Sequence, residues 1–369
     1  MHITNCKNRF NKKANDQKIK ILLAFDHELS LGGSSSYLND LFNPTDQLIE
    51  LATKHGVPIT LFTDILCAYR FKEWDKKGFF KTYCEQLTKT LKYGHDVQLH
   101  LHPHWLTSEF KNGSFIPSED FSLSNFAEGK YHNGTYWNIP GIINLAEEFL
   151  TDLCSGSKQD YKCIAFRAGG FNLYPATEMI ISALYEKGIR IDSSIAKNYN
   201  FSSNISEVDF HNMPSSANWY ISKNIVNKEG SIDGLLEIPI AASPRTPINN
   251  LSFLVKRVLL RNRMYKANGW AIHEKNTSLI KRFKRLFPSS SWLLSFDLYT
   301  HSVNDLIRIL DYHIRIHPED EVIICSTCSH PKNMGKYSHY LMREFINRVS
   351  KYKNEVEFCS YQQIYDSIL

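Results

Sequence analysis

The sequence predicts an α/β protein in which repeated strand–loop–helix units form a barrel. Two observations support this fold class. Short apolar runs of strand length alternate along the chain with segments whose apolar residues recur at helical spacing. In addition, each apolar run ends in polar or glycine-rich residues. That pattern is typical of a barrel whose strand ends form one functional rim.

The elements follow from these periodicities in chain order. Apolar residues of strand length and composition predict strands over 19–25, 57–62, 97–102, 163–166, 189–191, 235–240, 292–296 and 322–325. Apolar residues three and four apart predict helices over 46–54, 79–92, 142–153, 175–187 and 251–263. Gly56 and Gly188 follow two of these helices, where glycine commonly ends a helix.

The bulk composition limits the classes of protein. The 369 residues are 43% hydrophobic, which is enough for a large core and excludes a disordered chain. The net charge of +5 is mild and forms no concentrated basic stripe, so we do not expect nucleic-acid binding. The sequence contains no secretory h-region and no run of eighteen apolar residues, and we therefore expect a cytoplasmic protein.

We expect a flexible N-terminal arm over residues 1–17 and one barrel domain over 18–369. Insertions are expected near 106–140 and 245–290. The first is rich in aromatic residues and suits a substrate-facing loop or a small packed substructure. The second carries basic helical segments, including 281–285, that could contact a membrane surface or an anionic glycan, although such a pattern is more often a solvated face over a core. The sequence does not indicate an oligomeric state.

The densest chemical signal lies between residues 94 and 105. Val97, Leu99 and Leu101 alternate with polar residues that include His100 and His102, and Pro103 then ends the strand. His100 and His102 would lie on one strand face roughly 6.6 Å apart, a usable metal-binding pair. His100 and His104 can share an ion only if the chain turns at Pro103. Clustered imidazoles before a turn favour a metal site over a polar strand face.

Other strand ends add acid–base chemistry. Asp26 and Glu28 lie on one face of the first strand, so one can bind a metal while the other acts as a base. Arg167 can pair with a carboxylate and keep it ionised. His330 is a candidate general acid. The Cys325-Ser326-Thr327-Cys328 segment lacks a second CxxC, so we expect structural thiols rather than a redox or zinc role.

Together these segments resemble the motifs of the polysaccharide deacetylases of the NodB-homology type, which are family-4 carbohydrate esterases. The resemblance covers roughly residues 20–369. The motifs are Phe25-Asp26-His27-Glu28, Gly94-His95 with His100 to His104, Phe166-Arg167-Ala168-Gly169-Gly170, Asp192-Ser193-Ser194 and Ser329-His330-Pro331. The FDxE and LHLHPHW forms are most similar to the subgroup associated with lipopolysaccharide and capsule biosynthesis.

The resemblance implies a distorted (β/α)₇ barrel and a divalent metal, usually zinc, with manganese, cobalt or nickel as alternatives. Asp26 matches the family's catalytic base, Arg167 the arginine paired with that base, and His330 the histidine that acts as acid. His100 and His104 match the family's HxxxH metal pair. The usual second aspartate is replaced by His27.

We therefore predict Glu28 as the third metal ligand, with His27 and His102 as second choices. Trp105, Gly169 and Asp192 are the expected substrate contacts. The proline usual in the third motif is absent, because Ala168 and Gly169 stand there.

The implied reaction is the removal of an N-acetyl group from an amino sugar or a polysaccharide precursor of the cell envelope, either free or linked to a lipid. Two alternatives remain. One is a C–N hydrolase of the amidohydrolase type that uses His100 and His102 as an HxH pair. The other is a non-catalytic barrel that serves as a scaffold or glycan-binding module in envelope polysaccharide assembly.

Overall fold

The computed structural model describes residues 17–74, 78–111, 114–202, 206–222, 225–229, 234–245, 247–266, 269, 291–352 and 355–368. Most of the expected N-terminal arm, residues 1–16, lies outside this part of the chain, as do residues 270–290 with the basic segment 281–285.

A closed ring of parallel strands forms the centre of the protein. Its members pair in the order β2 (Ala24–His27), β3 (Thr60–Asp64), β4 (Asp96–Leu101), β9 (Ala165–Ala168), β10 (Ile191–Asp192) and β15 (Leu235–Glu237). The strand β18 (Val322–Ser326) closes the ring through parallel bridges between Phe25 and Ser329 and between Ile240 and Ser326. These strands confirm the predicted α/β fold class and its barrel of seven strands.

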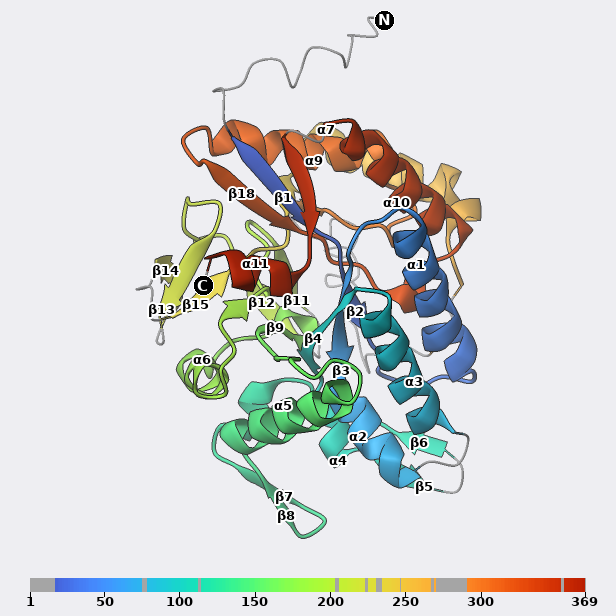
Figure 1. Ribbon diagram of the computed structural model, residues 1–369, viewed down its shortest axis with the longest axis vertical. Helices are drawn as coiled ribbons and strands as arrows, with labels where there is room; N and C mark the ends of the chain where they lie inside the picture. Colours follow the sequence, from blue (N-terminus) through green and yellow to red (C-terminus); the bar gives the residue numbers. More distant parts are fainter. Residues whose placement is uncertain are drawn as a thin grey trace, which may run out of the picture.

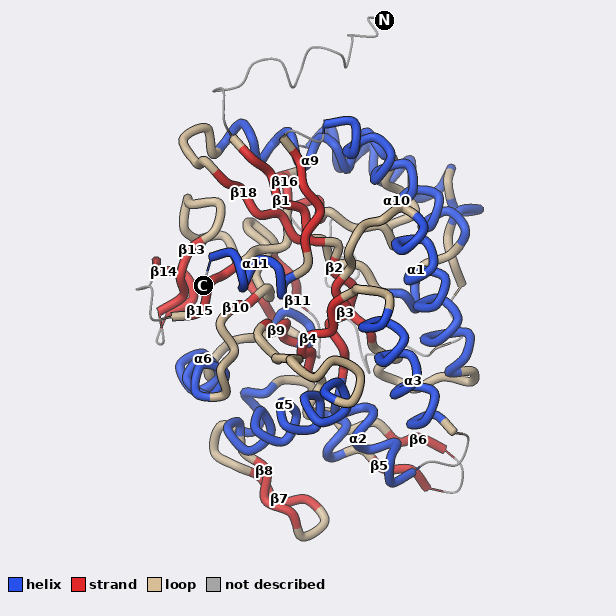
Figure 2. The backbone as a smooth tube through the Cα atoms, in the orientation of Figure 1, coloured by secondary structure: helices blue, strands red, loops and turns tan. Residues whose placement is uncertain are grey.

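Helices surround the ring, as Figures 1 and 2 show. The helices α1 (Asn43–Lys54), α3 (Phe79–Lys92) and α10 (Lys336–Val349) lie along one side of the strands, and α5 (Ile139–Ser155) and α6 (Thr177–Glu186) lie below them in the view of Figure 1. In the described part of the chain, the other α-helices of more than one turn are α2 (Ile65–Trp74), α7 (Pro247–Leu259), α9 (Val303–Ile316) and α11 (Tyr361–Ile368).

The predicted helix 79–92 coincides with α3. This helix buries Phe79, Tyr83 and Leu87, which recur at four-residue spacing on the face that meets the strands. Gly94 follows with a φ of 79°, a conformation that favours glycine and turns the chain into β4.

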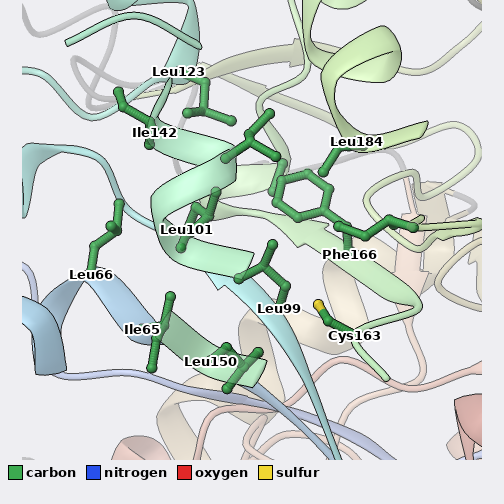
Figure 3. Close-up of a cluster of buried hydrophobic side chains, with 14 of the residues drawn as sticks. Ile65, Leu66, Leu99, Leu101, Leu123, Ile142, Leu150, Cys163, Phe166 and Leu184 are labelled. Atoms are coloured by element: carbon green, nitrogen blue, oxygen red, sulfur yellow. The ribbon is translucent and has the colours of Figure 1, made fainter. Parts of the chain in front are cut away.

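The largest hydrophobic cluster packs strand side chains against helices. Leu99 and Leu101 of β4 and Phe166 of β9 contact a layer that includes Ile142 and Leu150 of α5 (Figure 3). Because β4 is buried on both faces, its outer side chains build this core while its inner ones are free to form a site.

Two predicted strands differ from the structure. The first, 19–25, is divided at Leu23 into β1 (Lys18–Leu22) and β2. β1 pairs with β18 and β19 (Val356–Cys359), whereas β2 pairs with β3, so the chain changes partners between them. The second, 292–296, does not form a parallel barrel strand. Its first part is β17 (Ser291–Leu293), which pairs antiparallel with β16 (Ala242–Pro244).

The segment 106–140, where we expected an insertion, contains two hairpins. They are β5 (Glu109–Lys111) with β6 (Ser114–Ile116) and β7 (Lys130–His132) with β8 (Thr135–Trp137), and the single-turn helix α4 (His104–Thr107) precedes them. Elsewhere, β11 (Asn200–Ser202) pairs with β12 (Glu207–Asp209), and β13 (Trp219–Ser222) joins β14 (Ile225–Glu229) to the edge of β15.

The cysteines in the described residues are free thiols. Within the same residues, every helix is too short or too polar to span a bilayer.

Candidate active site

The carboxyl ends of β2, β4, β9 and β18 bring the predicted catalytic and metal-binding residues together. His100 lies opposite Asp64 of β3 on one side and opposite Arg167 of β9 on the other. Asp26 is the third residue of β2, and its backbone N–H donates to the Ser329 carbonyl, which brings His330 beside it. Parallel strands end at the same rim, and closure through β18 completes the site.

Three of the predicted side chains place their donor atoms within 4.8 Å of one another. Glu28, His100 and His102 are buried, and each offers one donor atom to the group. The Nε2 atom of His100 lies 3.1 Å from both Glu28 Oε2 and His102 Nε2, and His102 Nε2 also contacts Glu28 Oε2. Ligand atoms bound at about 2.0–2.1 Å to a tetrahedral Zn²⁺ lie about 3.3 Å apart. The two separations from His100 Nε2 are close to that value, whereas the Glu28–His102 contact is shorter, so the donor types suit such an ion and those two side chains would have to move apart to admit it.

Surrounding groups orient these donors. His100 Nδ1 donates to the Arg167 carbonyl at 2.8 Å, which leaves the lone pair of Nε2 directed at Glu28. Asp64 Oδ1 accepts the backbone N–H of His102 at 3.2 Å. A Cβ atom on Gly169 would lie 2.6 Å from His102 Nδ1 and 2.5 Å from the Leu101 carbonyl, so only glycine leaves room for the His102 ring.

His104, the partner predicted from the HxxxH pattern, lies outside this group. Its buried ring packs between those of Trp105 and Phe121 in tilted contacts, with centroid distances of 4.8 and 5.0 Å. Burial and the charge of His102 lower the pKa of His104 well below its usual value. Pro103 and the turn of α4 carry His104 away from the strand face that His100 and His102 share.

His27 also points elsewhere. Its Nδ1 contacts Thr63 Oγ1 at 2.7 Å and its Nε2 contacts Gln86 Oε1 at 2.9 Å, so the ring lies between β3 and α3. Burial lowers the pKa of His27 to about 4. Alternation along the strand explains this placement, because Asp26 and Glu28 face the interior of the barrel while His27 faces the helices.

Asp26 is held by a buried arginine. Arg167 Nη1 donates to Asp26 Oδ1 at 2.6 Å, and neither side chain is open to solvent. Burial tends to raise the pKa of Asp26, but the charge of Arg167, helped by His100 and His330, outweighs it and lowers that pKa. The carboxylate is therefore kept ionised, and its second oxygen, Oδ2, faces the site.

His330 stands across from Asp26, with 3.7 Å between its Nε2 and Asp26 Oδ2. Its Nδ1 donates to Asp297 Oδ2 at 2.8 Å, and its backbone N–H donates to the same oxygen at 3.1 Å. Burial opposes protonation, but the contact with Asp297 dominates and raises the pKa of His330 to about 9. The imidazole thus holds a proton on the nitrogen that faces the site.

Three further residues of this site were not predicted from the sequence. Asp64 and Asp297 each stand at or just after a strand-like segment, the same signal that identified Asp26, but they were not singled out. Lys332 had no local signal. Its Nζ donates to Glu28 Oε1 at 2.7 Å, and with His102 it lowers the pKa of Glu28 well below the usual value against the effect of burial.

The structure places two expected substrate contacts in the interior. Trp105 is fully buried and donates from Nε1 to Asp64 Oδ2 at 2.6 Å, so its ring is part of the core. Asp192 is buried as well and accepts from the hydroxyl and backbone N–H of Ser194. Burial raises the pKa of Asp192. Of the three expected contacts, Gly169 lies closest to the converging donors.

No family model matches the sequence, and no curated protein matches it. Several solved structures align with most of the chain at low identity. A putative polysaccharide deacetylase from Mycobacterium smegmatis is 12% identical with a TM-score of 0.46, covering 96% of this chain and 91% of that one. A probable polysaccharide deacetylase from Pseudomonas aeruginosa PAO1 has the same identity and TM-score, with 95% and 91% covered. A 4-alpha-glucanotransferase from Thermococcus litoralis also has 12% identity and a TM-score of 0.46, with 96% and 41% covered.

Proposed function

We propose that this protein is a metal-dependent hydrolase that removes N-acetyl groups from an amino sugar or a polysaccharide precursor. One observation carries the proposal. A carboxylate held ionised by Arg167 and an imidazole held protonated by Asp297 face each other across 3.7 Å, beside a three-donor group that suits a divalent cation. Amide hydrolysis needs a base for the attacking water, an acid for the leaving amine and stabilisation of the carbonyl oxygen.

The proposed cation ligands are Glu28, His100 and His102, with zinc as the first choice and manganese, cobalt or nickel as alternatives. Two neutral imidazoles and one carboxylate are a common ligand set for catalytic zinc. A divalent cation held there supplies Lewis acidity toward an amide carbonyl. Asp64 holds the His102 backbone, Gly169 leaves room for the His102 ring, and Lys332 holds the Oε1 atom of Glu28.

Asp26 is the proposed general base. Arg167 occupies its Oδ1 atom, so Oδ2 remains to accept the proton of the water that attacks the amide carbon. Because Arg167 is fully buried and anchored to the backbone of neighbouring strand ends, the base keeps its orientation while the proton moves.

His330 is the proposed general acid. It donates its Nε2 proton to the amine nitrogen as the C–N bond breaks, and Asp297 stabilises the charge that the ring carries before that transfer. The products are acetate and a free amino sugar. The proposed substrate belongs to a cell-envelope glycan, as in the lipopolysaccharide- and capsule-associated deacetylases that the motifs resemble.

The test measures acetate release from a panel of N-acetylated mono- and oligosaccharides, together with the metal content of the purified protein. Asp26→Asn should retain the metal and lose turnover. His102→Gln should lose the metal. His104→Gln, which changes the histidine two residues further along the chain, should retain it. A wild-type protein without bound metal and without acetate release would reject the proposal.

A second candidate is favoured by the HxH spacing of His100 and His102. Such a pair suits a C–N hydrolase of the amidohydrolase type that opens cyclic amides or ureides and releases no acetate. The same panel, extended by cyclic ureides and followed for loss of the ring amide, separates the two substrate classes. Ring opening without acetate release would favour this candidate over the deacetylase.

A further inference from the structure

A second group of donor atoms lies on the other side of Glu28. Asp26, Cys328 and His330 each offer one donor, and these atoms cluster within 4.8 Å of one another. The Cys328 thiol donates a long hydrogen bond to Asp26 Oδ2, with 3.6 Å between Sγ and the oxygen, and His330 Nε2 lies 3.7 Å from the same oxygen. The nitrogen–oxygen separation is too long for a hydrogen bond, which spans about 2.7–3.2 Å. The sulfur–oxygen separation matches the edge of about 3.6 Å expected in a tetrahedral zinc site, and the nitrogen–oxygen separation is about 0.4 Å longer than the corresponding edge of about 3.3 Å.

Glu28 supplies a fourth donor. Its Oε2 atom faces His100 and His102, while its Oε1 atom lies 3.6 Å from His330 Nε2. The carboxylate therefore stands between the two groups with one oxygen directed at each. Carboxylates bridge neighbouring ions in two-metal sites, where the ions lie about 3.5–4 Å apart.

We propose that Asp26, Cys328 and His330, completed by Glu28 Oε1, bind a second divalent cation of the thiophilic class, such as Zn²⁺ or Cd²⁺. The three-residue cluster stands on its own geometry. Only the bridging role of Glu28, and the effect on catalysis given below, rest on the proposed function.

The charges around the cluster make this the weaker of the two sites. Arg167 donates to Asp26 Oδ1 and Lys332 donates to Glu28 Oε1, so two cations already neutralise the carboxylates that a second ion would use. Binding also requires the buried Cys328 thiol and the His330 Nε2 atom each to lose a proton to the solvent, because the thiolate and the neutral imidazole are the ligands. We expect this site to fill only after the site formed by Glu28, His100 and His102.

Occupation of the second site would inhibit hydrolysis. The ion would take the lone pair of Asp26 Oδ2, which the proposed base needs, and that of His330 Nε2, which the proposed acid must protonate. Activity should therefore rise as zinc fills the first site and fall as an excess of zinc fills the second.

The CxxC segment provides a matched control. Cys325 belongs to β18, lies opposite Ile21 of β1 and is buried in the hydrophobic cluster beside that strand. Cys328 follows the strand end and faces Asp26. The two thiols are therefore directed to different environments, so Cys325→Ser removes a buried sulfur of the same segment without touching the proposed site.

The experiment titrates Cd²⁺ into the metal-free full-length protein and follows the ultraviolet charge-transfer absorption of the cadmium–thiolate bond together with the bound metal. The wild-type protein and Cys325→Ser should bind two equivalents, with the absorption growing during the second. Cys328→Ser should bind one equivalent with no absorption. His102→Gln should lose the first equivalent and keep the absorption.

Thermal unfolding of each variant shows whether it is folded. For a Cys328→Ser protein that fails to fold, Asp26→Asn replaces it, and this variant should weaken the second equivalent in the same way. A wild-type protein without charge-transfer absorption, or an absorption that persists in Cys328→Ser, overturns the inference. Acetate release without a second equivalent would leave the proposed function standing, and a second equivalent without any hydrolysis would reject only that function.

Discussion

The buried pair of Arg167 and Asp26 gives the most direct test of how the barrel holds its site. Arg167 is fully buried and makes five hydrogen bonds. One goes to Asp26 Oδ1 at 2.6 Å, and the others reach Ser193 through its carbonyl and hydroxyl, the Ser326 hydroxyl and the Thr327 carbonyl, at 2.9–3.1 Å. Arg167→Met fills most of the volume but leaves the Asp26 carboxylate buried without its cation.

The expected cost is large. Removing one partner of a buried ion pair typically destabilises a protein by about 3–5 kcal/mol. Unfolding entropy of about 2.1 cal/mol/K per residue over 369 residues gives about 0.8 kcal/mol/K, so Tm should fall by about 4–6 °C. The pKa of Asp26 should rise at the same time, because burial then acts on it without the opposing charge of Arg167.

The assay is differential scanning calorimetry at fixed pH, with a double-mutant cycle. Asp26→Asn combined with Arg167→Met should be more stable than the sum of the two single changes predicts, because neither charge is then left alone. Arg343→Met is the control, since that arginine forms an exposed pair with Glu344 worth about 0–1 kcal/mol. If Arg167→Met costs no more than Arg343→Met, Arg167 does not hold the site as argued.

Three further predictions test other contacts. Gly169→Ala should displace the His102 ring and lower the bound metal measured by elemental analysis, because the added Cβ would lie 2.6 Å from Nδ1. Asp297→Asn should cut the rate of acetate release by roughly 10²-fold and move the alkaline limb of the pH–rate profile to lower pH, because the general acid loses the group that raises its pKa to about 9. Burial lowers the pKa of His301 to about 4 and that of His313 to about 3, so each stabilises the fold above pH 6.5, and this contribution is lost as the pH falls toward those values. Calorimetry should find about 2 kcal/mol lost per histidine at pH 5.

Each of these predictions has a matched control. Gly156→Ala should leave the metal content unchanged, since a Cβ there meets nothing within 4 Å and the φ of −61° suits alanine. Asp366→Asn, on the exposed side of α11, should leave the pH–rate profile in place. His211→Gln removes an exposed histidine and should not flatten the acid limb of the stability curve. Equal effects in a variant and its control would contradict the corresponding prediction.

Local periodicity was enough to predict the fold class and most helices and strands. It did not predict which strand each strand pairs with. The helix 79–92 could be predicted from its own segment, because the residues of its buried face and the glycine that follows it all lie within one short stretch of sequence. The segment 292–296 is apolar enough for a barrel strand, yet its first part pairs antiparallel with β16. An apolar run predicts that a strand is buried. The strand that it pairs with depends on how the ring closes, which the run itself does not show.

In the site, too, residues marked by a local pattern were predicted and residues defined by distant contacts were not. Asp26, His100, Arg167 and His330 were predicted because each stands at or just after a strand end, and the structure brings them to one rim. Asp64 was missed because the strand predicted over 57–62 ends two residues before it, whereas β3 extends to Asp64.

Lys332 and Asp297 act through partners far away in the sequence, since Lys332 contacts Glu28 and Asp297 contacts His330. Only the closure of the barrel brings such pairs together. Asp297 follows the strand-like run 292–296, but no local pattern marks its pairing with His330, and none marks Lys332.

The choice between His102 and His104 follows from strand geometry rather than from composition. Side chains two residues apart on a strand share a face, so His100 and His102 reach the same carboxylate oxygen of Glu28. A spacing of four reaches that point only if the chain folds back after Pro103, and the turn of α4 instead directs His104 into the aromatic layer beside Trp105. The metal content of His102→Gln and His104→Gln therefore tests the course of the backbone at Pro103 as well as the identity of the ligand.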